Sequence, residues 1–344
     1  MSNSSCERRV RRTDHRQERL PIERGNAGIW HFSPSVRGRI DCLDWVRSCR
    51  WVVVTAILMT LAIHPVVARG ASAMPPAGSR SPLAWWADYA EAYDQAKMTH
   101  KMLLVFFEAK DDTASATFES HTLANPKTRS RLEQLVRVKL PLGTKIQVDG
   151  RDIRLLDHPA FQDMSHRQGF ALVDLEHEGE PYYGHVVSAF PFTPGSNYSS
   201  ERLKVVLDLP PGTITQRTMI YAVRIHPERP ASTWGTLQPV LVRAAQRQSQ
   251  YQAQIQLQGH HNWESRFHQI NSELPDGGPA TEVVAESWPG EDLVEACVDC
   301  VNSWRQSPGH WGAVRARHRF FGYDIKRGGN GIWYATGIFS GRQR

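Results

Sequence analysis

An uncharged and mostly apolar run, Trp51–Ile63, divides this chain, and a large folded core can form only after it. Arg47 and Arg50 precede the run, and the small residues 71–73 follow it. A basic flank, an apolar stretch of about 7–15 residues and a small-x-small site together are typical of a secretory signal. We therefore predict that the rest of the chain is exported to the periplasm or the extracellular space.

Residues 51–73 form either a cleaved signal peptide or an uncut signal anchor. About fifty polar residues precede the run, which is more than an ordinary signal carries. If it stays uncut, residues 51–67 would be a transmembrane helix in the inner membrane, although a full span needs about 20 apolar residues. The flanking segments are a basic, polar extension at 1–50 and a Pro/Gly/Ser-rich linker at 74–82.

The chain's charge argues against nucleic acid as a partner. Its net charge of +6 lies in residues 1–73, which hold twelve arginines and six acidic residues, so the remainder is balanced. Nothing after the signal supplies the clustered basic face that phosphate binding needs. We expect contact with a membrane only through the N-terminal segment.

Residues 83–207 show the pattern of an α/β domain. Apolar residues recur at helical spacing in 85–97, and Met102–Phe107 is a continuous apolar run typical of a strand covered on both faces. A helix near 127–135 and strands at 136–140, 170–175 and 182–188 are expected to follow.

This order, with the run AYDQAKMTHKMLLVFFEA, resembles the thioredoxin-like fold. The redox Cys-x-x-Cys of that fold would come directly after Phe107, where this chain reads Glu-Ala-Lys-Asp-Asp-Thr-Ala-Ser. Thiol–disulfide exchange needs a thiolate, so we expect a scaffold without redox activity. An α/β domain unrelated to thioredoxin is the alternative.

A second segment, 212–341, begins after Pro210-Pro211. Helical spacing predicts helices at 236–256 and 292–304, and aromatic and β-branched residues predict a terminal strand at 331–339. Residues 328–331, Gly-Gly-Asn-Gly, are expected to form a hairpin turn.

The second segment resembles the CAP superfamily (cysteine-rich secretory, antigen-5 and PR-1-like proteins), in particular its bacterial SCP type. Four runs carry the likeness in order: YAVRIHPE with LVRAAQRQSQYQA, QGHHNWESRF, TEVVAESW, and VNSWRQSPGHW followed by FFGYDI and GIWYATGIF. The resemblance implies a CAP-type α-β-α sandwich. The fold class expected for the whole chain is therefore α/β in two domains, a thioredoxin-like domain and a CAP-like domain.

The resemblance also implies a cleft with two histidines and two acidic residues, in some members around a divalent cation. His310 matches the Ser-Pro-Gly-His motif, Glu282 matches the first acidic residue, and His260 or His261 is the second histidine. The expected metal set is His261, Glu282 and His310, with zinc as the candidate cation, because imidazole and carboxylate suit such ions. Outside the family context, the adjacent His260 and His261 would be expected to lie on the surface in contact with water, and the Gly-His pair at His310 to end a helix.

The sequence does not identify the second acidic residue of the expected cleft. In many members a glutamate follows the helix tryptophan, but here residues 305–307, Arg-Gln-Ser, stand after Trp304. Glu286 substitutes if its stretch is helical, because a spacing of four residues puts it on the face of Glu282.

Cys297 and Cys300 are the two cysteines beyond the signal, against Cys6, Cys42 and Cys49 before it. Both fall on the apolar stripe of the predicted 292–304 helix, so we expect buried packing. A local disulfide is the alternative in an oxidising compartment.

Two functions remain after these exclusions. The first is a non-catalytic binding or adaptor protein of the cell envelope, with a cleft for an apolar, peptide or glycan ligand. The alternative is a hydrolase that uses the His/Glu cleft with a metal ion or by proton transfer. A shared fold does not bring one chemistry, which favours the first.

Overall fold

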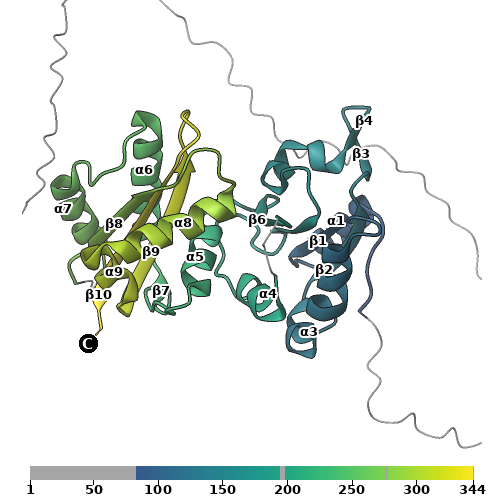
Figure 1. The fold of residues 1–344 in the computed structure, drawn as a ribbon, viewed down its shortest axis with the longest axis horizontal. Helices are drawn as coiled ribbons and strands as arrows, with labels where there is room; N and C mark the ends of the chain where they lie inside the picture. The colour runs from purple at the N-terminus through teal and green to yellow at the C-terminus, as the bar shows by residue number, and fades with distance from the viewer. Residues whose placement is uncertain (1–82, 194–197, 276–277, 344) are drawn as a thin grey trace, which may run out of the picture. The chain divides into compact units, whose positions relative to one another are not determined.

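The computed structural model describes residues 83–193, 198–275 and 278–343. These residues belong to a compact unit that begins at Pro76. The predicted polar extension, signal segment and linker all lie outside the described residues, so cleavage and anchoring stay predictions. The described fold is mixed α/β, with two four-stranded sheets and a two-stranded one, as expected of the class (Figure 1).

The first sheet has the order β2-β1-β5-β6. β1 runs parallel to β2 and antiparallel to β5, and β5 runs antiparallel to β6. Its strands and helices are α1 (Tyr89–Met98), β1 (Leu103–Glu108), α2 (Thr113–Thr117), α3 (Pro126–Leu132), β2 (Val136–Pro141), β5 (Gly169–Val173), β6 (Val186–Pro191) and α4 (Ser200–Leu207). A π-helical turn (Phe118–Leu123), the hairpin β3–β4 (Lys145–Val148 and Arg151–Arg154) and two 3-10 turns (Leu155–Asp157 and Pro159–Met164) complete it.

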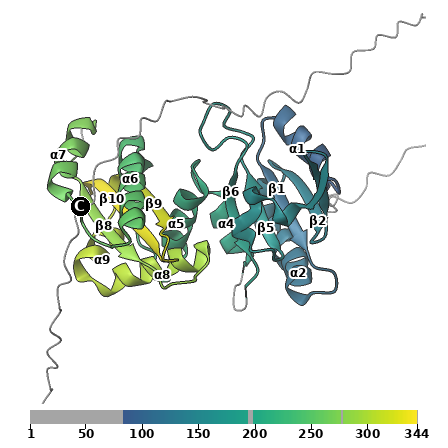
Figure 2. The same cartoon turned by 90° about the horizontal axis from the view of Figure 1, so that it is seen from above.

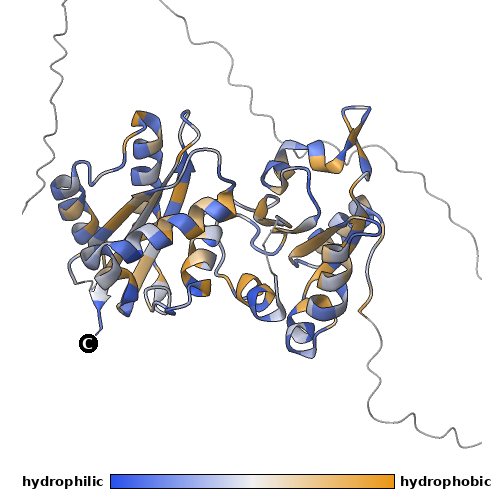
Figure 3. Ribbon diagram, viewed as in Figure 1, coloured by the Kyte–Doolittle hydropathy of each residue, from blue (hydrophilic) through white to orange (hydrophobic). Residues whose placement is uncertain are grey.

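The apolar run that predicted the central strand explains the core of this sheet. All of Leu103–Phe107 is buried, because helices cover both faces of β1. On one face Phe118 stacks on Phe170 with ring centroids 5.1 Å apart, and Phe170 stacks on Phe190 at 5.2 Å. The central strand β1 is therefore largely orange in the hydropathy view of Figure 3.

Two predicted boundaries in this segment need correction. The first helix begins at Tyr89 rather than residue 85, because Asp88 caps it and Trp86 pairs with β2 through a bridge to Val138. The last strand occupies Val186–Pro191 rather than 182–188, because residues 181–184 form a turn whose Gly184 N–H donates to Asp174 O.

The second sheet has the order β7-β9-β10-β8, so β8 is its edge strand. β7 pairs parallel with β9, and the other pairs are antiparallel. Its elements are α5 (Ile214–Ile225), β7 (Thr236–Leu237), α6 (Pro239–Ile255), α7 (Trp263–Glu273), β8 (Thr281–Glu286), α8 (Leu293–Gln306), α9 (Pro308–Arg315), β9 (His318–Arg327) and β10 (Trp333–Arg342). The hairpin predicted at residues 328–331 joins β9 to β10, where Gly331 N–H donates to Gly328 O.

Helices cover both faces of this sheet. α6 packs on β9 and β10, and α7 packs on α6. On the other face α5 packs on β9, α8 on β8 and β10, and α9 on β8. Figure 2 shows α6 and α7 on one side of the strands and α8 and α9 on the other. Helix α6 lies close to the sheet because Gly322 carries no side chain: a Cβ there would come within 2.4 Å of the α6 backbone.

The two sheets share helix α5, which contacts both β6 and β9. One continuous hydrophobic cluster includes residues from both segments, such as Phe190, Tyr221 and Phe321. Within the described residues, none of the helices is both long enough and apolar enough to span a bilayer.

Candidate functional site

The candidate site lies at the edge strand β8, and we call its four residues, His260, Arg266, Glu282 and His310, the histidine site. Glu282 is the second residue of β8 and pairs with Ile338 of β10. Its side chain is 1% exposed. It lies on the sheet face that α6 and α7 cover, because Val283 and Ala285 belong to the core under α8 and successive strand residues face opposite ways. A buried carboxylate needs partners, and the surrounding loops supply them.

His260 comes from the loop between α6 and α7. That loop begins at Gln256 and ends at Asn262, both in the left-handed backbone region (φ 54° and 52°). Two glutamines on the buried face of α6 hold it: Gln248 donates to Gly259 O (2.8 Å), and Gly259 N–H donates to Oε1 of Gln252 (3.1 Å). The position of His260 is therefore set by the packing of α6 on the sheet.

His260 links the buried carboxylate to the second histidine. Its Nδ1 lies 3.0 Å from Oε1 of Glu282, and its Nε2 lies 3.3 Å from Nε2 of His310, which belongs to the first turn of α9. An ionised carboxylate only accepts hydrogen bonds, so Nδ1 of His260 carries the proton. The two Nε2 atoms of His260 and His310 share one hydrogen bond, whose donor depends on the tautomers of the two rings.

Arg266 of α7 completes the histidine site. Its NH1 donates to Oε2 of Glu282 (2.5 Å) and its NH2 to Oε1 (2.8 Å), a bidentate ion pair. Its Nε donates to His261 O (3.0 Å), and its guanidinium lies 5.1 Å above the ring of Trp263. The negative charge of Glu282 is therefore already neutralised by the protein.

The environment of His310 favours its neutral form. Burial lowers the pKa of His310 below its usual value and the neighbouring His260 lowers it further, while Glu282 acts in the opposite direction. His260 is more open to solvent, with 43% of its side chain exposed. The imidazole pair is thus a half-buried donor set that solvent can reach.

The donor set fits a zinc-class cation only in part. Two nitrogens, each about 2.0–2.1 Å from a tetrahedral zinc, lie roughly 3.3 Å apart, and the two Nε2 atoms are separated by 3.3 Å. The Glu282–His260 hydrogen bond is also the carboxylate–histidine arrangement that orients zinc ligands. Glu282 itself is not free to bind, because Arg266 holds both of its oxygens. Within the described residues no group of three or more His, Cys, Asp or Glu side chains is arranged to hold a metal ion.

Two residues expected at the cleft lie elsewhere. His261, which we placed in the metal set, turns its Nε2 toward Leu257 O (3.1 Å) and packs its ring against Tyr251, so His260 is the histidine that meets His310. Glu286 lies at the far end of a strand rather than on a helix. Four residues along a strand span about 13 Å, which separates it from Glu282.

The structure gives the two cysteines of α8 as free and fully buried, which agrees with packing on the apolar face of the helix rather than with a local disulfide. Burial raises the pKa of both thiols well above the usual range.

In the first segment, polar side chains occupy the turn after β1. Ser115 donates to Oε1 of Gln168 (2.7 Å), and Gln168 donates to Asp112 (2.8 Å), which caps α2. Without a thiol, this network offers no group for disulfide exchange.

Arg266 is the functional residue that sequence reasoning missed. The signal available was weak: a carboxylate removed from water needs a cation, and Arg266 is the cation in the run QGHHNWESRF. Nothing in the sequence pairs it with Glu282, sixteen residues away on another element.

Comparisons with known proteins add little to this geometry. No protein family and no curated protein matches the sequence. Among solved structures, the chain is similar to an outer surface protein from Borrelia burgdorferi, with a TM-score of 0.27 and 17% identity over 32% of this chain and 78% of that one. A likeness this weak supports no argument about fold or function.

Proposed function

We propose that this protein is an exported, non-catalytic binding or adaptor protein of the cell envelope. Its C-terminal part would be a CAP-like sandwich that binds a ligand at the histidine site, and its N-terminal part a thioredoxin-like docking scaffold. The basic flank, apolar run and small-residue site at the N-terminus support export. The order of the CAP-like runs and the helices on both faces of the second sheet support the sandwich.

The observation that carries the non-catalytic proposal is the ion pair between Arg266 and Glu282. A carboxylate that serves as general base or metal ligand must offer a free oxygen to a proton or a cation. Both oxygens of Glu282 accept from Arg266, and Oε1 also accepts from His260. Glu282 is therefore positioned to orient His260 rather than to react.

What remains for a ligand is the pair of Nε2 atoms on His260 and His310. A zinc-class divalent cation held by these two nitrogens would keep open coordination positions. A donor group from a peptide or glycan in the envelope would fill these positions. In this arrangement Glu282 holds the proton on Nδ1 of His260 and so leaves Nε2 free to bind.

Calorimetric titration of the purified protein with zinc tests this proposal. We expect His260→Ala and His310→Ala each to weaken zinc binding at least tenfold, because each removes one of two nitrogen ligands. The matched control is His261→Ala, whose ring is bonded to Leu257 O and which should bind zinc as the unaltered protein does. Equal losses in all three variants, or no loss in any, would contradict the proposal.

Hydrolysis is the second candidate, because the Glu282–His260 hydrogen bond also resembles the orienting half of a catalytic dyad. Incubation with envelope peptides and glycans, followed by mass spectrometry of the products, separates the two functions. Cleavage that is lost in His310→Ala but kept in His261→Ala would replace the binding proposal with an enzymatic one.

Export and anchoring are tested separately from the site. Mass spectrometry of the mature N-terminus distinguishes cleavage near residues 71–73 from retention of residues 51–67 as an anchor in the inner membrane. A cytoplasmic chain with an intact N-terminus would refute export altogether.

A further inference from the structure

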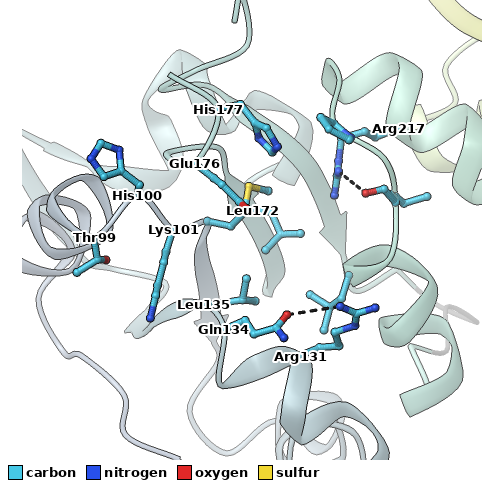
Figure 4. Close-up of a pocket in the computed structure, with 14 residues that line it drawn as sticks. Thr99, His100, Lys101, Arg131, Gln134, Leu135, Leu172, Glu176, His177 and Arg217 are labelled. Carbon is cyan, nitrogen blue, oxygen red and sulfur yellow. Dashed lines mark hydrogen bonds between the residues drawn. The ribbon is translucent and has the colours of Figure 1, made fainter. Parts of the chain in front are cut away.

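A second candidate binding site is a cavity of about 520 Å³ that is lined mainly by the first segment and by Arg217 of α5, and it includes no residue of the histidine site (Figure 4). Its volume is within the range of small-molecule pockets. Its walls come from the ends of α1, α3 and α4, the residues before β1, the loop after β5, and Arg217 of α5. Neither the predicted cleft nor the turn after β1 includes this cavity.

Arg217 is the feature that gives this cavity its chemistry. The residue is only 4% exposed, yet its hydrogen bonds within the described residues all go to neutral oxygens. The acceptors are Ser188 Oγ, Leu209 O, Pro210 O and Val206 O. Burial lowers the pKa of Arg217 to about 10, which leaves it charged at neutral pH.

One hydroxyl and three carbonyls accept hydrogen bonds from Arg217, but these neutral groups do not neutralise its charge. The carboxylate of Asp174 acts on it at longer range. That carboxylate is committed to the His177 ring (2.8 Å) and to two backbone N–H groups. A buried cation without an ionic partner is costly, so an anion that enters the cavity gains from the charge of Arg217.

Other cationic side chains surround the same hollow. Lys101 forms no ion pair within the part of the chain that the structure describes, and Arg131 pairs with Asp208 (2.8 Å). Figure 4 shows Arg217, Arg131 and Lys101 around the cavity. His100 and His177 also line it, while Glu176 is the one carboxylate among the lining residues. The walls therefore favour a negative ligand.

Apart from Thr99 and Gln134, the rest of the lining is apolar and comes from several elements: Met102, Leu135, Leu172, Leu207, Leu209 and Pro211. Inorganic anions would gain nothing from these side chains. We propose that this cavity binds an amphipathic anion, a carboxylate or phosphate headgroup on an apolar tail, with the headgroup at Arg217 and Lys101. The tail would contact Leu135 and Leu172.

Calorimetric titration with octanoate and octyl phosphate tests the proposal, and octylamine, which has the same tail and the opposite charge, is the control ligand. We expect both anions to bind and octylamine not to bind, with the tighter anion identifying the headgroup. The proposal would be overturned if octylamine binds as tightly as the anions. It would also be overturned if neither octanoate nor octyl phosphate binds.

Variants at other lining residues test whether the ligand binds in this cavity. Arg217 itself is not replaced, because its removal would also leave the carbonyl oxygens that accept its hydrogen bonds without a donor. Lys101→Gln should weaken octanoate binding about fivefold because it removes a charged partner, whereas Lys97→Gln, on α1 outside the cavity, should leave binding unchanged. Leu135→Trp fills the cavity and should abolish binding. If both Lys101→Gln and Leu135→Trp bind octanoate with unchanged affinity, the cavity is not the binding site. This result is independent of zinc binding at the histidine site.

Discussion

Replacing Arg266 by methionine should destabilise the protein through the carboxylate that the arginine neutralises. Glu282 is 1% exposed and Arg266 is 19% exposed, so the ion pair is largely removed from water. Breaking one partner of such a pair costs about 3–5 kcal/mol, because it leaves an uncompensated buried charge. Arg266 keeps some access to solvent and His260 still donates to Glu282, so we expect a loss near the lower limit, about 3 kcal/mol.

Urea denaturation followed by circular dichroism measures this loss. With an m-value of about 3 kcal/mol/M, the midpoint of unfolding should fall by about 1 M. Arg243→Met is the matched control, since Arg243 is exposed on α6. Its unfolding free energy should change by less than about 0.5 kcal/mol.

The double variant Arg266→Met/Glu282→Gln isolates the ionic contribution. A neutral glutamine needs no cation, so the double variant should recover about 2 kcal/mol of what the single variant loses. The reasoning fails if the double variant is no more stable than Arg266→Met. It also fails if Arg266→Met unfolds at the same urea concentration as the unaltered protein.

Three further predictions concern Gly322, the two cysteines of α8 and His310. Gly322→Ala should cost about 1–3 kcal/mol by thermal unfolding, because its Cβ would come within 2.4 Å of the α6 backbone; Gly312→Ala, with open space on α9, should cost nothing, and equal costs would contradict the packing. Cys297 and Cys300 should resist iodoacetamide in the native protein and react only after unfolding, as peptide mass mapping can show. The depressed pKa of His310 makes its contribution to stability complete above the unfolded pKa of about 6.5 and lost as the pH falls through the folded value. His310→Gln should therefore flatten the decline in unfolding free energy below about pH 6.5, and an unchanged slope would refute this.

Local patterns were enough to predict part of the strands and helices, but not α4, α5 or α7. Met102–Phe107 predicted β1 to within one residue, because a strand covered on both faces must be apolar throughout. The stripe of Cys297, Cys300 and Trp304 predicted α8, whose Asp292 cap was included in the expected range. The two-residue β7 and the β3–β4 hairpin were missed, since these strands are only two to four residues long and none of their side chains is buried.

The same patterns misjudged the second acidic residue. TEVVAESW has the composition of either a helix or a strand, and the four-residue spacing of Glu282 and Glu286 suits one face of both. The structure makes it the edge strand β8. On a strand the spacing becomes a separation of about 13 Å, so the two carboxylates cannot share a ligand.

The sequence alone determined the classes of segment in this protein: an apolar run with the marks of an export signal, two α/β stretches, and a first segment without the thiols that redox exchange requires. Only the tertiary structure decided that His260 rather than His261 meets His310, and that Arg266 holds the carboxylate of Glu282. The physical reason is that periodicity and composition report how a segment buries its own side chains. A charge in the core is instead balanced by whichever partner the packing of separate elements brings to it.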